Sequence, residues 1–126
     1  METRVMIKIS RAKEKTIFLG PGDGRTRILI ASEDGAVNLS MGHMRFPAGG
    51  KTDTHVRETE EVIYIIKGRS AIITKTGRYE LEAGDAIHIS PGTEHYHENI
   101  GSEEMEHIWI FAPQGPEETI RKLPAE

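Results

Sequence analysis

Six histidines give this sequence its clearest chemical signal, and all of them lie within residues 43–107. Two segments, 49–61 and 84–99, place histidines next to acidic residues and glycines. Imidazole and carboxylate side chains bind divalent metals, and two histidines with one carboxylate suit iron(II), manganese or nickel while leaving positions open for a substrate. The two segments together carry five candidate site residues: His55, Arg57, Glu61, His95 and His97.

Strand geometry indicates how these side chains could meet. Side chains two positions apart lie on the same face of a strand, so His55 and Arg57 point together, as do His95 and His97. If Glu61 opens the next strand facing inward, two neighbouring segments would bring imidazoles and a carboxylate to one mouth of a barrel. The same adjacency argues against His95 and His97 binding one ion, because two such side chains hardly converge.

The elements that must position these residues are short and rich in β-forming residues. Glycine and proline turns separate them, which predicts an antiparallel sandwich or barrel. One helix is predicted at 116–123, with proline and acids in its first turn and bases in its last. The predicted strands are 27–31, 36–46, 62–66, 71–75, 79–81, 86–89 and 106–112.

Composition excludes several classes of protein. The chain has 126 residues and no cysteine, which fits one compact domain and removes disulfide scaffolds, zinc ribbons and thiol catalysis. A net charge of −4 without a basic run argues against nucleic-acid binding. No apolar window is long enough for a membrane span, and the first residues lack a signal-peptide core, so a cytoplasmic location is predicted.

Both segments resemble the two sequence motifs of the cupin superfamily, G-x5-H-x-H-x3-4-E-x6-G and G-x5-P-x-G-x2-H-x3-N. Two positions depart from these motifs: Arg57 stands at the second histidine, and Ser90 stands at the proline. The matching positions are Gly49, His55, Glu61 and Gly68 in the first motif and Gly84, Gly92, His95 and Asn99 in the second.

The resemblance implies an all-β fold, a small double-stranded β-helix or jelly-roll barrel with a short C-terminal helix. Residues 1–126 would form one cupin domain, with motif 1 at about 49–68 and motif 2 at about 84–99. The resemblance also implies that His55, Glu61 and His95 bind a divalent metal ion: iron, manganese or nickel, with zinc as a further candidate. His97 is either a fourth ligand or a base or hydrogen-bond donor in the pocket.

Arg57 leaves two interpretations open, because a guanidinium has no lone pair and cannot bind a metal. It either pairs with Glu61 and replaces the ion, or it holds an anionic substrate beside an open coordination position. Arg57 and His97 are therefore the predicted catalytic residues. The predicted function is a metal-dependent oxygenase acting on a small oxygen-rich or anionic metabolite. The alternatives are a redox-neutral lyase, isomerase or decarboxylase, and a non-catalytic module that binds a sugar or metabolite.

Two runs, 62–66 and 105–111, are apolar on both alternating faces. A strand with one wet face should alternate instead, so their outer face is either covered by the terminal helix or an arm, or buried in a homodimer. The homodimer is predicted, and residues 4–9 are a candidate strand for exchange between subunits.

The remaining predictions concern the walls of the barrel. Ile63, Ile65, Ile87 and Ile89 are expected to line its cavity. His88 is predicted to face outward, and His43 is either a wall residue or a pocket residue. His107 and Trp109 share one face, where they either pack in the core or line the pocket.

Overall fold

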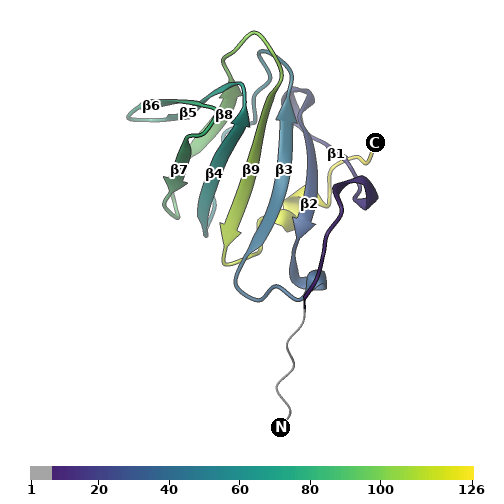
Figure 1. The fold of residues 1–126 in the computed structure, drawn as a ribbon. Coiled ribbons are helices and arrows are strands. Elements are labelled where there is room, and N and C mark those ends of the chain that lie inside the picture. The colour runs from purple at the N-terminus through teal and green to yellow at the C-terminus, as the bar shows by residue number, and fades with distance from the viewer. Residues whose placement is uncertain (1–6) are drawn as a thin grey trace.

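The structure is a computed structural model that describes residues 7–126 and contains nine strands and four short helices (Figure 1). The helices are η1 (Ala12–Glu14), η2 (Pro21–Asp23), η3 (Ser32–Asp34) and α1 (Glu117–Ile120). The strands are β1 (Phe18–Leu19), β2 (Arg25–Ile30), β3 (Ser40–Phe46), β4 (Glu60–Lys67), β5 (Arg69–Thr74), β6 (Arg78–Glu82), β7 (Ala86–Ile89), β8 (His95–Asn99) and β9 (Met105–Ala112).

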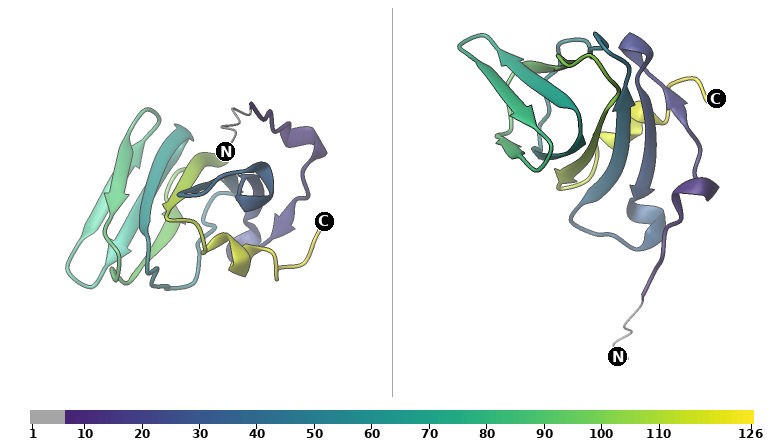
Figure 2. Two further views of the ribbon diagram at one scale, coloured as in Figure 1. Left: turned by 90° about the horizontal axis from the view of Figure 1, so that it is seen from below. Right: turned by 45° about the horizontal axis from the view of Figure 1, so that its top comes forward.

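These strands form two antiparallel sheets. Six of them pair in the order β1-β2-β3-β9-β4-β7, and the other three pair in the order β6-β5-β8. The small sheet lies at the end of the molecule away from the N-terminal and C-terminal segments (Figure 2). This arrangement confirms the predicted all-β jelly-roll barrel. None of the described helices is long and apolar enough to cross a membrane.

The inner face of the large sheet forms most of the core. On β4, Ile63 and Ile65 are buried, and they alternate with the more exposed side chains between them. On β9, Trp109 and Phe111 are buried on the same inner face. Because successive side chains of a strand point to opposite sides, this alternation fixes which residues of β4 and β9 face the barrel interior.

The outer face of β4 is apolar and partly exposed. Tyr64 is 48% exposed and Ile66 is 44% exposed. Tyr64 lies opposite Ile108 of the neighbouring strand β9. The terminal helix does not cover this face, because its residue Ile120 packs into the core on the inner side. The predicted exchange strand lies partly outside the described residues, and Ile7, its first described residue, is 89% exposed and not in a strand.

The structure corrects one predicted strand and the predicted helix, and it adds one strand that was not predicted. The strand predicted at 36–46 begins only at Ser40, because residues 35–38 form a turn and bends. The helix predicted at 116–123 ends at Ile120, residues 121–123 form a turn and a bend, and Ala125 then bridges Phe18 of β1, a strand that was not predicted. In that pairing Leu19 donates its backbone N–H to Pro124 over 2.7 Å.

The motif glycines are explained by turn geometry. Gly49, Gly68, Gly84 and Gly92 all have positive φ, a conformation in which only glycine carries no steric cost. Gly68 also lies close to the chain entering β9, where a Cβ would approach the carbonyl oxygen of Glu104 within 3.0 Å. The fixed spacing of glycines in the sequence therefore marks the turns that bring the two motifs together.

Candidate metal centre

The segment 51–55 of motif 1 lies against β8 of motif 2. His55 and His95 exchange two backbone hydrogen bonds, of 2.9 and 3.0 Å. Three residues earlier, Thr52 donates its N–H to the carbonyl of His97 over 2.9 Å, and its Oγ1 accepts the N–H of His97 over 3.0 Å. This docking places the histidines of both motifs next to one another.

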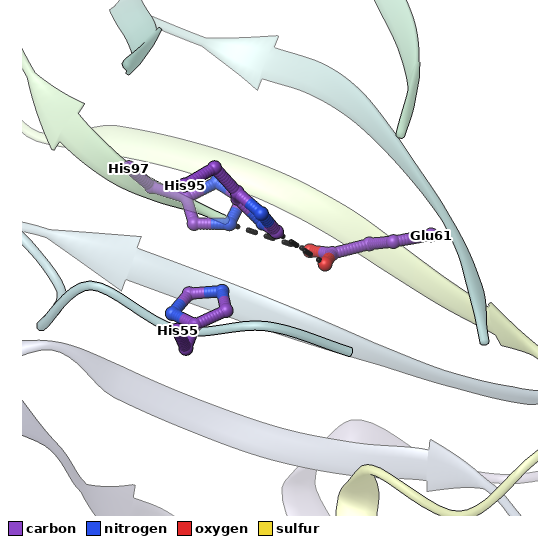
Figure 3. Close-up of side chains that lie close together, drawn as sticks. All are labelled: His55, Glu61, His95 and His97. Carbon is purple, nitrogen blue, oxygen red and sulfur yellow. Dashed lines mark ion pairs between the residues drawn. The ribbon is translucent and has the colours of Figure 1, made fainter. Parts of the chain in front are cut away.

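Four side chains converge at this junction: His55, Glu61, His95 and His97, called here the histidine–glutamate cluster (Figure 3). Each offers one ligand atom, and these atoms all lie within 4.8 Å of one another. Nε2 of His95 and Nε2 of His97 each lie 3.3 Å from a different carboxylate oxygen of Glu61. A three-histidine, one-glutamate group is thus positioned for a metal ion.

The hydrogen bonds of the rings fit metal binding. Nδ1 of His55 lies 2.9 Å from the carbonyl of Asp53, and Nδ1 of His95 lies 2.8 Å from the carbonyl of Thr93. With the ring proton on Nδ1, each Nε2 keeps a free lone pair directed into the cluster. Nε2 of His95 and Oε1 of Glu61 are buried and have no hydrogen-bond partner among residues 7–126, as expected of ligand atoms that face an ion.

The protonation states of His55 and Glu61 also suit a metal. Burial and the nearby His97 and Arg57 lower the pKa of His55 to about 4, so its imidazole is neutral at pH 7. Burial alone would raise the pKa of Glu61, but the imidazoles of His95 and His97 outweigh that effect and hold it well below its usual range. A neutral imidazole and an ionised carboxylate are the forms that bind metal ions.

His95 and His97 lie closer together than the strand argument predicts, and whether both bind one ion stays a prediction. Their ring centroids lie 5.0 Å apart with planes inclined at 72°, and both rings reach Glu61. Because Glu61 enters from β4 opposite β8, its two oxygens meet one ring each. Arg57 stands at the motif 1 position where a second histidine is expected. His97 of motif 2 supplies the third imidazole of the cluster instead.

Arg57 does not pair with Glu61. Among residues 7–126, the ion pairs of Glu61 are those with His95 and His97. The Arg57 guanidinium instead lies 5.7 Å from the ring centre of Phe111, and its buried Nε has no hydrogen-bond partner. The interpretation in which Arg57 takes the place of the metal therefore has no support in the geometry.

A cavity of about 240 Å³ adjoins the cluster and is lined by His55, Arg57, Glu61 and His97. The four isoleucines predicted to line it do not: Ile63, Ile65 and Ile89 belong to the buried core, and Ile87 packs against that core. The wall is built instead from aromatic residues of the large sheet and from the C-terminal segment: Phe46, Trp109, Phe111, Ile120 and Leu123.

The histidines outside the cluster divide between the two faces of the sheet. His107 lines the cavity, is buried, and has its ring centroid 5.8 Å from that of His97. Burial and the nearby His97 lower the pKa of His107 to about 3. His43 is not a pocket residue: it pairs with Ile108 on the outer face of the sheet. His88 is exposed, as predicted, and lies 2.7 Å from Glu60.

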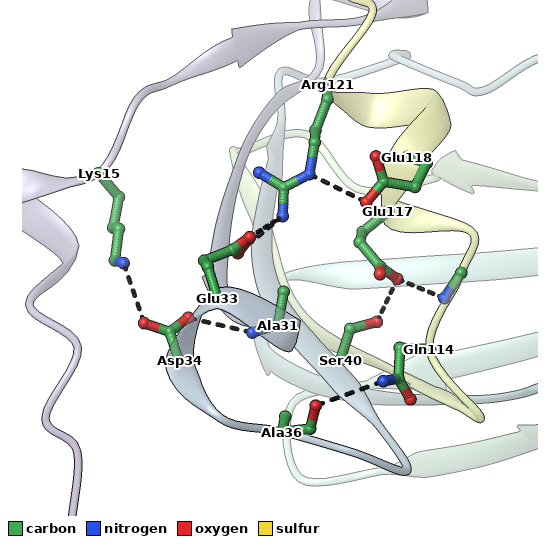
Figure 4. Close-up of polar contacts among 11 residues, drawn as sticks. Lys15, Ala31, Glu33, Asp34, Ala36, Ser40, Gln114, Glu117, Glu118 and Arg121 are labelled. Carbon is green, nitrogen blue, oxygen red and sulfur yellow. Dashed lines mark hydrogen bonds and ion pairs between the residues drawn. The ribbon is translucent and has the colours of Figure 1, made fainter.

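The C-terminal segment is fixed over the cavity by polar contacts (Figure 4). The buried carboxylate of Glu117 accepts hydrogen bonds from the Ser40 hydroxyl, over 2.7 Å, and from the backbone N–H of Gly115, over 2.8 Å. Arg121 pairs with Glu33 at 2.6 Å. A short C-terminal helix was predicted, but its contacts with Ser40 and Glu33 were not, because the partners lie 77 and 88 positions apart and only the fold brings them together.

Residues 42–111 match the family described as Cupin domain. The chain belongs to this family. Over 103 residues the cupin is 33% identical to an uncharacterized protein of Methanocaldococcus jannaschii, a match that covers 81% of this chain and 82% of the relative.

Solved structures share the fold at lower sequence identity. The polyketide cyclase RemF from Streptomyces resistomycificus is 21% identical, with a TM-score of 0.75 and coverage of 88% of this cupin and 82% of RemF. KdgF from Halomonas sp. is 16% identical, with a TM-score of 0.77 and coverage of 90% and 99%. A predicted oxalate decarboxylase from Thermotoga maritima is 20% identical, with a TM-score of 0.74 and coverage of 86% and 100%.

Proposed function

We propose that this cupin is a metal-dependent enzyme that acts on a small anionic or oxygen-rich metabolite. The observation that carries the proposal is the convergence of four ligand atoms within 4.8 Å beside a cavity. His55, Glu61 and His95 would hold the ion, with His97 as the fourth ligand. Iron, manganese and nickel accept this mixture of imidazole and carboxylate, and zinc is a further candidate.

The bound ion would supply either Lewis-acid polarisation of a substrate oxygen or the redox centre for dioxygen chemistry. With His55, Glu61, His95 and His97 as ligands, the side of the ion toward the cavity would stay open to small molecules. The side chains of the cupin position the reactants: Arg57 would hold an anionic group in the cavity, and the buried wall would exclude water. The first candidate reaction is an oxygenation, because open positions beside histidine and carboxylate ligands suit iron(II).

A redox-neutral lyase, isomerase or decarboxylase is the second candidate, and Arg57 favours it. The Arg57 guanidinium, which makes no ion pair within the described residues 7–126, could give the anchoring and charge stabilisation that enolate-forming reactions use. Two structural neighbours carry names of this kind, a cyclase and a predicted decarboxylase, although their likeness extends to the fold alone.

Oxygen consumption separates the two candidates. The cupin loaded with iron(II) is assayed in air with a panel of small carboxylic acids and diketones, and product formation is then compared in air and without oxygen. An oxygenase consumes oxygen in step with product and stops without it. Turnover that continues without oxygen supports the redox-neutral candidate. A cupin that takes up no metal after incubation with iron, manganese, nickel and zinc favours the binding module, and the proposal of a metal-dependent enzyme then fails.

We also propose that the cupin is a cytoplasmic homodimer. The partly exposed apolar outer face of β4, with Tyr64 and Ile66, supports the dimer, because burial of such a face against a second copy removes apolar surface from water.

A further inference from the structure

One side of the cavity is an aromatic wall without free hydrogen-bonding groups. Phe46, Trp109 and Phe111 are each at most 4% exposed, and the rings of Trp109 and Phe111 lie 4.9 Å apart with planes inclined at 34°. The indole N–H of Trp109 donates to Thr26 Oγ1 over 3.1 Å, and that hydroxyl donates to the carbonyl of His43 over 2.9 Å. The polar group of the indole is therefore already used, and the three aromatic residues offer a ligand apolar contact, while Thr52, Asp53, Thr119 and His107 line other parts of the cavity.

Glycines hold this wall in one position. A Cβ on Gly42 would lie 2.0 Å from Trp109, and a Cβ on Gly24 would lie 2.6 Å from Phe46. The aromatic rings occupy the space that a side chain would take at those positions, so they pack directly against the backbone of β3 and of the turn before β2. A fixed apolar surface binds a rigid, flat molecule without the entropy cost of ordering its own side chains.

Arg57 places a positive charge in the cavity, which calls for an anionic group on the ligand. Its guanidinium lines the same cavity, its Nε is buried without a hydrogen-bond partner, and it makes no ion pair within residues 7–126. A partly buried charge is normally paired, and a guanidinium pairs best with a carboxylate, through two parallel hydrogen bonds. The cavity thus contains, beside an apolar wall, the Arg57 guanidinium, which makes no ion pair within residues 7–126.

We propose that the cavity binds a small monoanionic carboxylic acid with a flat apolar body, of the size of benzoate, whose carboxylate pairs with Arg57. A volume of about 240 Å³ lies below the range of pockets for drug-sized ligands, which sets the size. A polyhydroxylated acid fits poorly, because its hydroxyls would lose water against a wall that cannot hydrogen-bond them. This inference deepens the proposed function and rests on it in one respect: the ligand would share the cavity with the metal.

Fluorescence tests the inference directly, because Trp109 is the single tryptophan of the chain and forms part of the wall. The cupin, with its metal content measured, is titrated with three probes: benzoate, benzamide and gluconate. We expect benzoate to change the Trp109 emission saturably, and benzamide and gluconate to bind at least about tenfold more weakly, since each lacks one of the two features recognised. Equal binding of benzamide, equal binding of gluconate, or no response to benzoate would each overturn the inference.

Two pairs of variants localise the binding. Arg57→Met keeps an unbranched apolar side chain but removes the charge, and should weaken benzoate about tenfold to a hundredfold. Arg69→Met, at an exposed arginine outside the cavity, is the matched control and should leave the affinity unchanged. Leu123→Asn in the wall should weaken benzoate about threefold or more, whereas Leu39→Asn, at an exposed leucine, should not. Unchanged benzoate affinity in Arg57→Met would overturn the inference even if Leu123→Asn weakened it.

Metal analysis of the same samples separates this inference from the proposed function. Loss of benzoate binding in Arg57→Met at unchanged metal content supports the inference on its own. A wild-type cupin that binds benzoate through Arg57 but takes up no metal would refute the proposed enzyme and leave the pocket assignment standing. A cupin that takes up metal but binds benzoate, benzamide and gluconate equally well would keep the metal centre and refute the inference.

Discussion

His55 and His95 face each other across a two-residue antiparallel bridge, with backbone hydrogen bonds of 2.9 and 3.0 Å and ring centroids 4.4 Å apart. The bridge uses only backbone atoms, so it does not depend on either imidazole. The side chains are thereby left free for chemistry, while the backbone fixes where they meet. This separation of roles makes the metal site testable without dismantling the fold.

Replacement of His55 by alanine should spare the metal-free fold and abolish stabilisation by metal. An ion that binds only the folded state raises the free energy of unfolding by about 2.7 kcal/mol at a free concentration of 100 times its dissociation constant. We expect this rise in the wild type and a loss of most of it in His55→Ala, measured by denaturant unfolding with and without added metal. An equal rise in both proteins would show that His55 is not a ligand.

Glu117 should make stability depend on pH in the acid range. Burial alone would raise its pKa, but hydrogen bonds from Ser40 and the backbone of Gly115 outweigh that effect and lower it. A folded-state pKa below the unfolded one stabilises the protein above the unfolded pKa, near 4.5, and that contribution is lost as the pH falls through the folded pKa. Glu117→Gln should cost about 1–3 kcal/mol at pH 7, and the gap to the wild type should narrow below about pH 4.5.

Urea unfolding at a series of pH values measures this gap. Glu118→Gln is the matched control, because Glu118 is exposed and its pair with Arg121 lies at the surface. Such a pair contributes at most about 1 kcal/mol. A pH-independent gap for Glu117→Gln would mean that the carboxylate of Glu117 does not stabilise the fold through its charge.

Gly42→Ala should disturb the aromatic wall. The added Cβ would lie 2.0 Å from the Trp109 ring and 2.4 Å from the carbonyl oxygen of Arg27, so either the indole or the strand must move. Overpacking of this kind costs about 1–3 kcal/mol. Thermal unfolding measures the loss, and the emission of Trp109 reports the shift of the ring. At Gly101 a Cβ has its nearest contact at 3.5 Å, so Gly101→Ala should leave both readings near wild type.

Tyr64→Glu should convert the proposed dimer to monomers. Tyr64 is 48% exposed on the outer face of β4, where a buried carboxylate in a dimer would be costly. Tyr79→Glu is the control, since Tyr79 is similarly exposed, at 51%, but lies on β6 of the small sheet. Sedimentation velocity should show a dimer for the wild type and Tyr79→Glu and a monomer for Tyr64→Glu. A monomeric wild type would refute the dimer.

The sequence predicted what depends on local spacing. The motif glycines mark turns with positive φ, and the apolar runs 62–66 and 105–111 lie in strands β4 and β9 of the large sheet. Both motifs contribute to the cluster because the fold aligns segment 51–55 with β8. The barrel was predicted from these regularities, and the grouping of His55, Glu61 and His95 from the resemblance to the two cupin motifs.

Long-range packing explains what the sequence did not predict. Residue Ile120 reaches the cavity only because Glu117 is tied to Ser40, 77 positions earlier. Whether the His43 side chain points into the barrel depends on which face of β3 meets the core. The pattern of polar and apolar residues along β3 does not show which face that is. The joint approach of His95 and His97 to one carboxylate depends on the position of β4 opposite β8, which no local pattern reports.

Metal content tests the central claim most directly. The cupin is incubated with iron(II), manganese, nickel and zinc in turn, passed over a desalting column, and measured by elemental analysis beside Glu61→Gln, His95→Ala and the exposed control His88→Ala. We predict one ion per chain in the wild type and His88→Ala, and a tenfold or greater loss in the two cluster variants. A wild-type protein without metal, or cluster variants that retain it in full, would contradict the assignment of His55, Glu61, His95 and His97 as a metal centre.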